Sequence, residues 1–203
     1  MSSVLSFEAV SGASIENYID DLARLRMTVF REFPYLYEGS LEYEKRYLKT
    51  FTESKESILI VAKHNQKVVG VSTGLPLKDE EDFIVRPFLN TQFKDLKGFY
   101  FSESVLLKEY RGQGAGQKFF QLREEKAKNL NADFATFCAV VRPVDHPRRP
   151  KGYKTLESFW QKQGFQKMEG VQTQMAWRDL DEASESTKTM QFWVKTMLKA
   201  HHR

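Results

Sequence analysis

The chain has 203 residues, of which 41% are hydrophobic, and charged residues of both signs make up 29%. This balance predicts one domain with a sizeable core and excludes the disordered and fibrous classes. The formal net charge of +4 suits an anionic small ligand. It falls short of the dense basic stripe that marks a nucleic-acid binder, so we expect no nucleic-acid partner.

The single cysteine, Cys138, cannot form an intramolecular disulfide, and with only four histidines the chain is not expected to hold a metal. The first residues show no leader pattern, and no apolar run reaches the length of a membrane span. We therefore expect a cytoplasmic protein that does not bind membranes. A lone cysteine within "TFCAVV" is typical of a small buried residue rather than an acyl carrier.

Hydrophobic periodicity and turn residues predict the elements in chain order. The first half contains a strand at 4–10, helices at 15–33 and 41–51, and a β-hairpin at 57–77. Residues 79–97 stay ambiguous, because Pro87 disfavours a long helix there. The second half contains a strand at 98–107, a helix at 115–130, a strand at 133–141, a proline-rich loop at 142–154 and a helix at 155–163. A pair of strands at 165–170 and 173–180, a linker at 181–186 and an amphipathic helix at 190–198 complete the chain.

The predicted order is β-α-α-β-β-β-α-β-α-β-β plus a C-terminal helix. This is an α/β fold with a mixed sheet, and it lacks the strict βαβ alternation of a doubly wound fold. We expect one domain over residues 1–180, followed by a linker and helix over 181–203. On the helix at 115–130, the spacing places Arg123 on the solvent side.

The stretch "YRGQGAG", residues 110–116, places a glycine-rich turn between a predicted strand and a predicted helix. The first N–H groups of a helix lack partners within the helix and attract anions, and glycines let backbone donors approach an oxygen. A pyrophosphate is the expected ligand. The ATP-binding loop fits poorly, because no Ser or Thr follows Lys118, and the dinucleotide fingerprint fits poorly, because the spacing is G-x-G-x-G.

The loop resembles the acyl-CoA-binding loop of the GNAT N-acetyltransferase superfamily, R/Q-x-x-G-x-G/A, with Arg111, Gly114 and Gly116 at its fixed positions. Downstream, "FWQKQGF" is similar to the family motif F-Y-x-x-x-G-F. The likeness extends over roughly residues 4–178. It implies that the CoA pyrophosphate and pantetheine are bound by a set of residues around the loop: Leu106, Leu107, Arg111, Gly112, Gln113, Gly114, Ala115 and Gly116.

The resemblance also implies catalytic groups. Family members often carry a glutamate base in the strand before the loop, which here is Glu103. The usual acid is the tyrosine of the downstream motif, but Trp160 occupies that position and an indole cannot donate a proton as an acid. Either Tyr153 replaces it, or the leaving thiolate is protonated through water. The expected acceptor-binding residues lie in two loops: Tyr35, Tyr37 and Glu38 in the first, and Asp145 and His146 in the second.

The sequence therefore predicts an enzyme that moves an acetyl group from acetyl-CoA to a primary amine, without a metal. The amine, a small molecule or a peptide, is not identified by the sequence. The alternative is a non-catalytic protein with the same fold that binds or senses acyl-CoA. The apolar face at 190–198 could dock within the chain or on a second copy, so a homodimer is one expected assembly.

Overall fold

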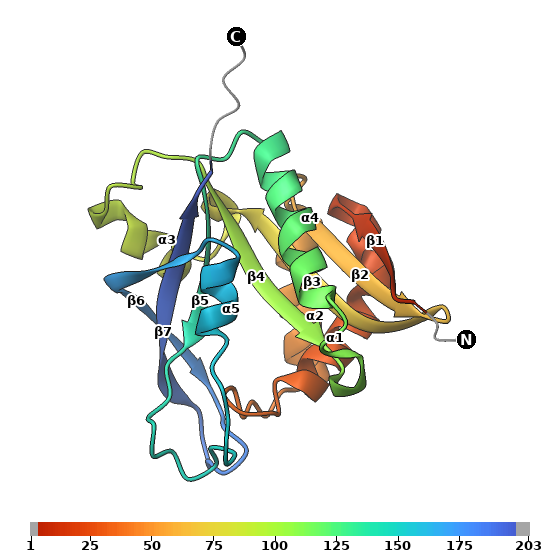
Figure 1. Cartoon of the computed structure of the whole chain (residues 1–203), viewed down its shortest axis with the longest axis vertical. Helices are drawn as coiled ribbons and strands as arrows, with labels where there is room; N and C mark the ends of the chain where they lie inside the picture. Colours follow the sequence, from red (N-terminus) through yellow and green to blue (C-terminus); the bar gives the residue numbers. More distant parts are fainter. Residues whose placement is uncertain (1–3, 198–203) are drawn as a thin grey trace.

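Seven strands form one mixed sheet in the order β1-β2-β3-β4-β5-β7-β6 (Figure 1). The computed structural model describes residues 4–197. The strands are β1 (Ser6–Val10), β2 (Ile58–His64), β3 (Lys67–Pro76), β4 (Gly98–Leu106), β5 (Phe134–Val140), β6 (Gln166–Trp177) and β7 (Ser186–Thr196). The α-helices are α1 (Ile19–Val29), α2 (Leu41–Glu53), α3 (Asp82–Val85), α4 (Ala115–Asn129) and α5 (Glu157–Lys162). Short 3-10 turns are η1 (Gly12–Tyr18), η2 (Leu77–Asp79), η3 (Arg86–Asn90) and η4 (Lys108–Tyr110).

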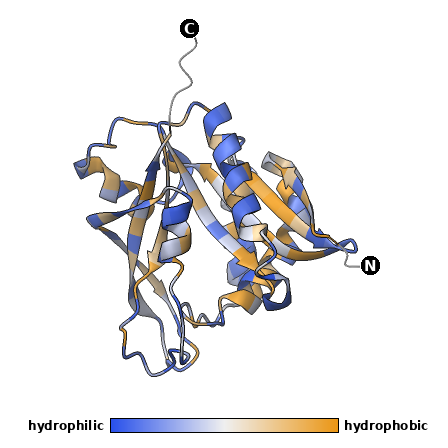
Figure 2. Cartoon of the chain, in the orientation of Figure 1, coloured by the Kyte–Doolittle hydropathy of each residue, from blue (hydrophilic) through white to orange (hydrophobic). Residues whose placement is uncertain are grey.

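Helices cover both faces of the sheet, and each face has its own apolar core. On one face, Phe119 of α4 belongs to a core that includes Phe99 and Phe101 of β4. On the other face, Leu25 of α1 and Leu48 of α2 belong to a core that includes Val71 of β3. Figure 2 shows hydrophobic strands in the interior and a mostly hydrophilic outer side of α4. The mixed sheet between two helical layers confirms the predicted fold class.

The connection between β3 and β4 contains only short pieces of helix, as Pro87 implied. Helix α3 covers four residues, and η3 continues with Pro87 near its start. The predicted helix at 15–33 is divided, because η1 precedes α1 and α1 ends at Val29. None of the helices within residues 4–197 is long and apolar enough to cross a bilayer.

The predicted C-terminal helix at 190–198 is wrong for the residues that the structure describes, since Ser186–Thr196 form strand β7. This strand lies between β5 and β6 and pairs antiparallel with both. Both of its faces are buried: Met190 and Phe192 belong to one core and Trp193 to the other. A strand buried on both faces lacks the alternation that marks a half-exposed one, which left the helical spacing of Met190 and Val194 as the stronger pattern.

This correction changes the basis of two further expectations. A boundary at residue 180 does not separate a C-terminal unit, because β7 is an inner strand of the sheet. The apolar residues of 190–197 pack inside the chain, so they give no reason to expect a homodimer. The two strands predicted at 165–170 and 173–180 are one strand, β6, whose pairing with β7 is interrupted between Lys167 and Gln172.

Candidate functional site

Strands β4 and β5 form a fork. They run parallel and pair over three residues each, Gly98–Tyr100 with Phe134–Thr136. Beyond these pairs β4 continues to Leu106 and β5 to Val140, and Figure 1 shows the two strands diverging toward the end where α4 begins. The unpaired inner edges of the two arms leave backbone N–H and C=O groups that a ligand can bind.

A β-bulge lies in the β4 arm of the fork. Between Phe101 and Ser104 the strand advances three residues, while the paired residues of β3, Gly74 and Ser72, are two apart. Such an extra residue re-aims side chains and is frequent next to active sites. As a result, Ser102 and Glu103 both contact residues on the α1–α2 side of the sheet.

Glu103 is buried in an ion cluster. One of its carboxylate oxygens accepts a hydrogen bond from Arg26 of α1, and the other accepts one from Thr73 Oγ1 at 3.0 Å. Arg26 also pairs with Glu44 of α2. Burial raises the pKa of Glu103, and Arg26 and Thr73 oppose this rise. Because donors occupy both oxygens, the position of Glu103 favours a part in holding the bulge over direct proton transfer.

Arg123 stabilises the bulge from the opposite face. Its guanidinium donates to the carbonyl oxygens of Thr73 and Glu103 at 3.3 and 3.4 Å, and it lies over the ring of Phe101 at 4.2 Å. The side chain is almost completely buried, and burial lowers its pKa to about 9. The prediction that Arg123 faces solvent is therefore wrong, because its guanidinium binds backbone carbonyl groups at the bulge.

A second carboxyl group, that of Glu80, lies at the same place. It follows η2, and its Oε1 accepts a hydrogen bond from Ser102 Oγ at 3.1 Å. Burial raises the pKa of the Glu80 carboxyl to about 7. An ionisable group tuned close to neutral pH beside a fork of this kind is a candidate for proton transfer.

The glycine-rich turn leads from the β4 arm into α4. Gly112 and Gly114 have φ values of +77° and +84°, a left-handed region that favours glycine, and Gly114 is the residue that caps the helix without any side-chain hydrogen bond. The first hydrogen bond at the helix start joins Lys118 N–H to the Gly114 carbonyl at 3.1 Å. The N–H groups of Ala115, Gly116 and Gln117 therefore have no acceptor within the helix and can bind an anion.

The third glycine has a different purpose. A Cβ on Gly116 would meet the ring of Phe159 in α5 at 3.3 Å, whereas a Cβ on Gly112 or Gly114 would meet nothing within 4 Å. Gly116 thus permits close packing of α4 against α5. Gly112 and Gly114 permit the turn and leave the space in front of the helix start open.

Arg111 fixes the turn. Its Nε donates to the Leu106 carbonyl at 3.0 Å, and its two terminal nitrogens donate to the carboxylate of Glu32 at 2.8 and 2.9 Å. Leu106 and Leu107 were both predicted to contact the cofactor, but the strand geometry points their N–H groups in opposite directions. Leu107 N–H already donates to the Val69 carbonyl in β3 at 3.0 Å, and since N–H groups alternate in direction along a strand, that of Leu106 faces the fork.

Trp160 and Tyr153 lie in different surroundings. Trp160 packs against Phe137 and Trp193 at ring distances of 5.0 and 5.2 Å, in the core on the α4 side. Tyr153 contacts the ring of Phe33 edge-on at 4.7 Å, and burial raises the pKa of its hydroxyl. A phenol with a raised pKa is a weaker proton donor, so its assignment as the acid stays a prediction without support from its environment.

The first expected acceptor loop has one side chain close to the fork and one turned away from it. Tyr35 packs between Phe30 and Trp177, and burial raises the pKa of its hydroxyl. Its electrostatic neighbours include Cys138 and Arg26, which places it beside the fork. Glu38 pairs with exposed Arg31 at 2.8 Å, so the charge expected to hold an amine is already matched.

Tyr37 and the second loop complete the expected acceptor side. The pKa of Tyr37 is raised by burial and by nearby Glu44, which places its hydroxyl near the ion cluster. Asp145 is exposed, and the ring of His146 lies against that of Phe33 at 5.7 Å. Phe33 thus brings the second loop to the first, because Tyr153 contacts it too.

A partly buried arginine connects the two loops. Arg142 donates to the carbonyl oxygens of Pro34 and Tyr35 at 2.7 Å each and pairs with both oxygens of Asp179. Lys188 of β7 lies 3.4 Å from the same aspartate. This network holds the backbone that carries Tyr35, and charge-assisted bonds of this kind fix geometry well.

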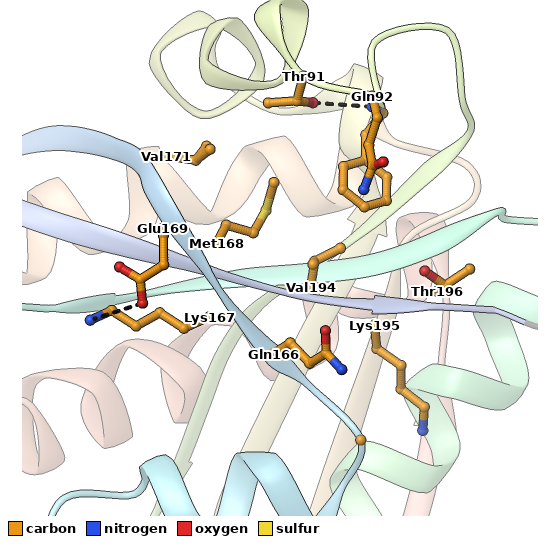
Figure 3. A pocket seen from close by; sticks show the side chains of 12 residues that line it. Thr91, Gln92, Gln166, Lys167, Met168, Glu169, Val171, Val194, Lys195 and Thr196 are labelled. Carbon is orange, nitrogen blue, oxygen red and sulfur yellow. Dashed lines mark hydrogen bonds and ion pairs between the residues drawn. The ribbon is translucent and has the colours of Figure 1, made fainter.

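The larger of two described hollows lies away from the fork. It has a volume of about 530 Å³ and is lined by the residues that follow η3 and by the interrupted part of β6. Figure 3 shows Thr91 and Gln92 at one rim, Met168 and Val194 below them, and Lys167 beside Glu169. Lys167 and Glu169 are paired, and Lys195 is paired with Glu124, so the polar lining offers little unmatched charge. We place the functional site at the fork instead, because Glu80, Glu103 and the glycine turn lie there.

Arg26, Glu44 and Glu80 belong to the site and were not among the residues predicted for it. Arg26 and Glu44 occupy buried positions on their helices, Arg26 beside Leu22 and Leu25, and Glu44 one turn before Leu48. A charged residue at a core position of a helical pattern is a signal that could have revealed both. Glu80 lies in a short turn and carries no such signal.

A family model and several solved structures match the chain. A family model described as the acetyltransferase (GNAT) family matches residues 20–165. No curated protein matches the sequence at a significant level. The solved structure of a ribosomal-protein-alanine N-acetyltransferase from Brucella melitensis is similar, with a TM-score of 0.61, 13% identity, and coverage of 95% of this chain and 99% of that one.

Two similar solved structures contain acetyl-CoA. One is NAA60 of Arabidopsis thaliana, with a TM-score of 0.60, 8% identity and coverage of 96% of this chain and 99% of that one. The other is a GNAT family acetyltransferase from Elizabethkingia anophelis, with a TM-score of 0.52, 14% identity and coverage of 95% and 98%. At these identities the likeness shows a shared fold.

Proposed function

Because the chain belongs to the GNAT acetyltransferase family, we propose that it transfers an acetyl group from acetyl-CoA to a primary amine. The observation that carries this proposal is the fork of β4 and β5 ending in an uncapped helix start at Gly114. Family and fold confirm the resemblance drawn from the glycine loop. The acetyl-CoA in the Arabidopsis and Elizabethkingia structures supports the choice of donor.

The residues present fit acetyl-CoA. The N–H groups of Ala115, Gly116 and Gln117 would hold the pyrophosphate, and the positive end of the α4 dipole adds to their attraction. Arg111 holds the turn through Leu106 and Glu32 and is not required to contact the phosphates itself. Gly112 and Gln113 would contribute backbone only, and Gln113 already has a side-chain bond to the Glu109 carbonyl at 3.4 Å.

The fork would position the reacting end of the donor. Acetyl-CoA supplies an acetyl thioester there. The Leu106 N–H, which faces the fork, would donate a hydrogen bond to the thioester carbonyl and stabilise the negative charge that develops on its oxygen. The acceptor would enter from the α1–α2 side, where Tyr35 and Tyr37 provide aromatic walls. The amine attacks directly in a ternary complex, because Cys138 is buried and burial raises the pKa of its thiol to about 12.

The assignments of Glu103 and Tyr153 as base and acid stay predictions. In our account Glu103 fixes the bulge through Arg26 and Thr73, and Tyr153 helps Phe33 to close the acceptor side. Asp145 and His146 would meet the distal part of a larger acceptor, because they belong to the loop at the rim of this side.

The test is transfer to a panel of amines. The protein is incubated with acetyl-CoA and, separately, a polyamine, free lysine, a peptide with a free N-terminus and an aminoglycoside, and both CoA thiol and acetylated product are measured. We expect at least one amine to raise thiol release about tenfold or more over the background hydrolysis, with matching product by mass spectrometry. Binding of acetyl-CoA without transfer to any amine would contradict the enzyme and favour the acyl-CoA sensor.

A further inference from the structure

The carboxyl group of Glu80 lies over the base of the fork. Its hydrogen-bond donor Ser102 stands two residues beyond Tyr100, the last paired residue of β4. Its electrostatic neighbour Cys138 stands two residues beyond Thr136, the last paired residue of β5. The hydroxyl of Tyr100 and the Cys138 sulfur are 3.1 Å apart, so these side chains of the two arms point to the same face of the sheet.

Glu80 differs from the other acidic groups of this side in its partners. Arg26 holds both Glu44 and Glu103. Among the ion pairs of residues 4–197, none involves Glu80, and its two hydrogen-bond donors are neutral: the Ser102 hydroxyl and the Glu81 N–H, the latter at 3.3 Å. A carboxylate held only by neutral donors keeps the ability to take up a proton.

Glu80 is also reachable, since its side chain is only partly buried, whereas Glu44 and Glu103 are buried. The groups that face it come from every element around it: Glu81 from its own turn, Tyr47 from α2, Tyr100, Ser102 and Glu103 from β4, and Cys138 from β5. The charged ones, Glu81 and Glu103, are negative and oppose ionisation of Glu80.

We propose that Glu80 is the catalytic residue that accepts a proton from the acceptor amine. This rests on the proposed function. The nitrogen forms a bond to the thioester carbonyl carbon, the C–S bond breaks, and the sulfur leaves with the electron pair. An amine that arrives as ammonium loses two protons on its way to an amide. Glu80 takes the first proton and passes it to water. The loss of the second is balanced by protonation of the departing sulfur, so one proton per turnover is released to the solvent.

The position of Glu80 explains why it suits this role. Burial and the neighbouring carboxylates bring its pKa to about 7, so that near neutral pH it is partly ionised and still basic enough to bind a proton. The ionised form is the active one. Activity should therefore rise as the pH increases through about 7 and level off above it.

The first experiment compares kcat/KM of the wild type, Glu80→Gln and Glu81→Gln from pH 5.5 to 9 with an amine that the panel identifies. We expect the wild type to rise with an apparent pKa near 7. Glu80→Gln should lose this rise, fall about 100-fold at pH 8 and keep its affinity for acetyl-CoA. Glu81→Gln removes the adjacent, exposed charge that opposes ionisation of Glu80, so its rise should move to lower pH while its activity at pH 8 stays that of the wild type.

A second measurement does not need activity. Carbon-13 NMR of labelled glutamate side chains, on the protein without acetyl-CoA, should show a carboxyl that titrates near pH 7 and disappears in Glu80→Gln. Normal transfer and an unchanged pH profile in Glu80→Gln would overturn this inference and leave the proposed function standing. A Glu80 carboxyl that titrates near its ordinary value would overturn it too. If the wild type acetylates no amine of the panel, both fall together.

Discussion

Arg26→Ala is expected to lower the free energy of unfolding by about 3–5 kcal/mol at pH 8, because it leaves two buried carboxylates without their common cation. Arg26 is 9% exposed, and Glu44 is completely buried. One oxygen of Glu44 already has no hydrogen-bond partner among the residues described. Burial disfavours the charged guanidinium, but Glu103 and Glu44 outweigh this and hold its pKa above the ordinary value.

The loss should depend on pH in a defined direction. Without Arg26, burial would hold the folded-state pKa of Glu103 further above its unfolded value. The unfolded chain then releases this proton first, and the stability of the variant falls as the pH rises above about 4.5. Urea unfolding at pH 5 and pH 8 measures this, and the deficit relative to the wild type should be larger at pH 8.

Two further variants serve as comparisons for this result. Arg31→Ala removes an arginine whose side chain is 53% exposed and pairs with Glu38 on the surface, so it should cost less than about 1 kcal/mol. Arg26→Lys keeps a positive charge but loses the planar set of donors that reaches two carboxylates. Its loss of stability should lie between those of the other two variants. An Arg26→Ala protein within about 1 kcal/mol of the wild type at pH 8 would show that the cluster does not hold α1 and α2 against the bulge.

Gly114→Glu is expected to weaken acetyl-CoA binding at least about 100-fold. The substitution forces a side chain into a left-handed backbone with φ of +84° and places a carboxylate in front of the helix start, where the pyrophosphate would lie. Isothermal titration calorimetry with acetyl-CoA measures the dissociation constant. The strain alone should cost on the order of 1–2 kcal/mol of stability, so the variant should fold.

Gly170→Glu is the matched control. Gly170 has φ of +75° in the interrupted part of β6, and a Cβ there meets nothing within 4 Å, as at Gly114. The two variants therefore share the backbone strain and the added charge and differ in place. Gly170→Glu should bind acetyl-CoA as the wild type does. Equal affinity in both variants, or an equal loss in both, would contradict the assignment of the glycine turn.

The glycine turn and the strand before it could be predicted from the sequence because their signals are local. Three glycines within five residues, directly before a helical pattern, have few structural explanations. The sequence does not reveal which glycine does what. The distance from Gly116 to Phe159 depends on how α5 packs, and α5 lies more than 40 residues further on.

The rest of the site could not be predicted because it depends on contacts between distant segments. The bulge shifts Glu103 into contact with Arg26, 77 residues away, and leaves carbonyl groups that bury Arg123. A strand pattern alone does not show an inserted residue. Glu80 comes to the fork only because the turn after β3 ends beside Ser102. Strand β7 was missed for a similar reason, since its place between two strands decides its burial.

The melting temperature with and without acetyl-CoA shows whether the glycine turn and the fork bind this donor. A ligand present at about 100 times its dissociation constant adds about 2.7 kcal/mol of stability. For a chain of this length that corresponds to a rise of roughly 5–11 °C, and we expect such a rise for the wild type and none for Gly114→Glu. An unchanged melting temperature of the wild type at millimolar acetyl-CoA would contradict it.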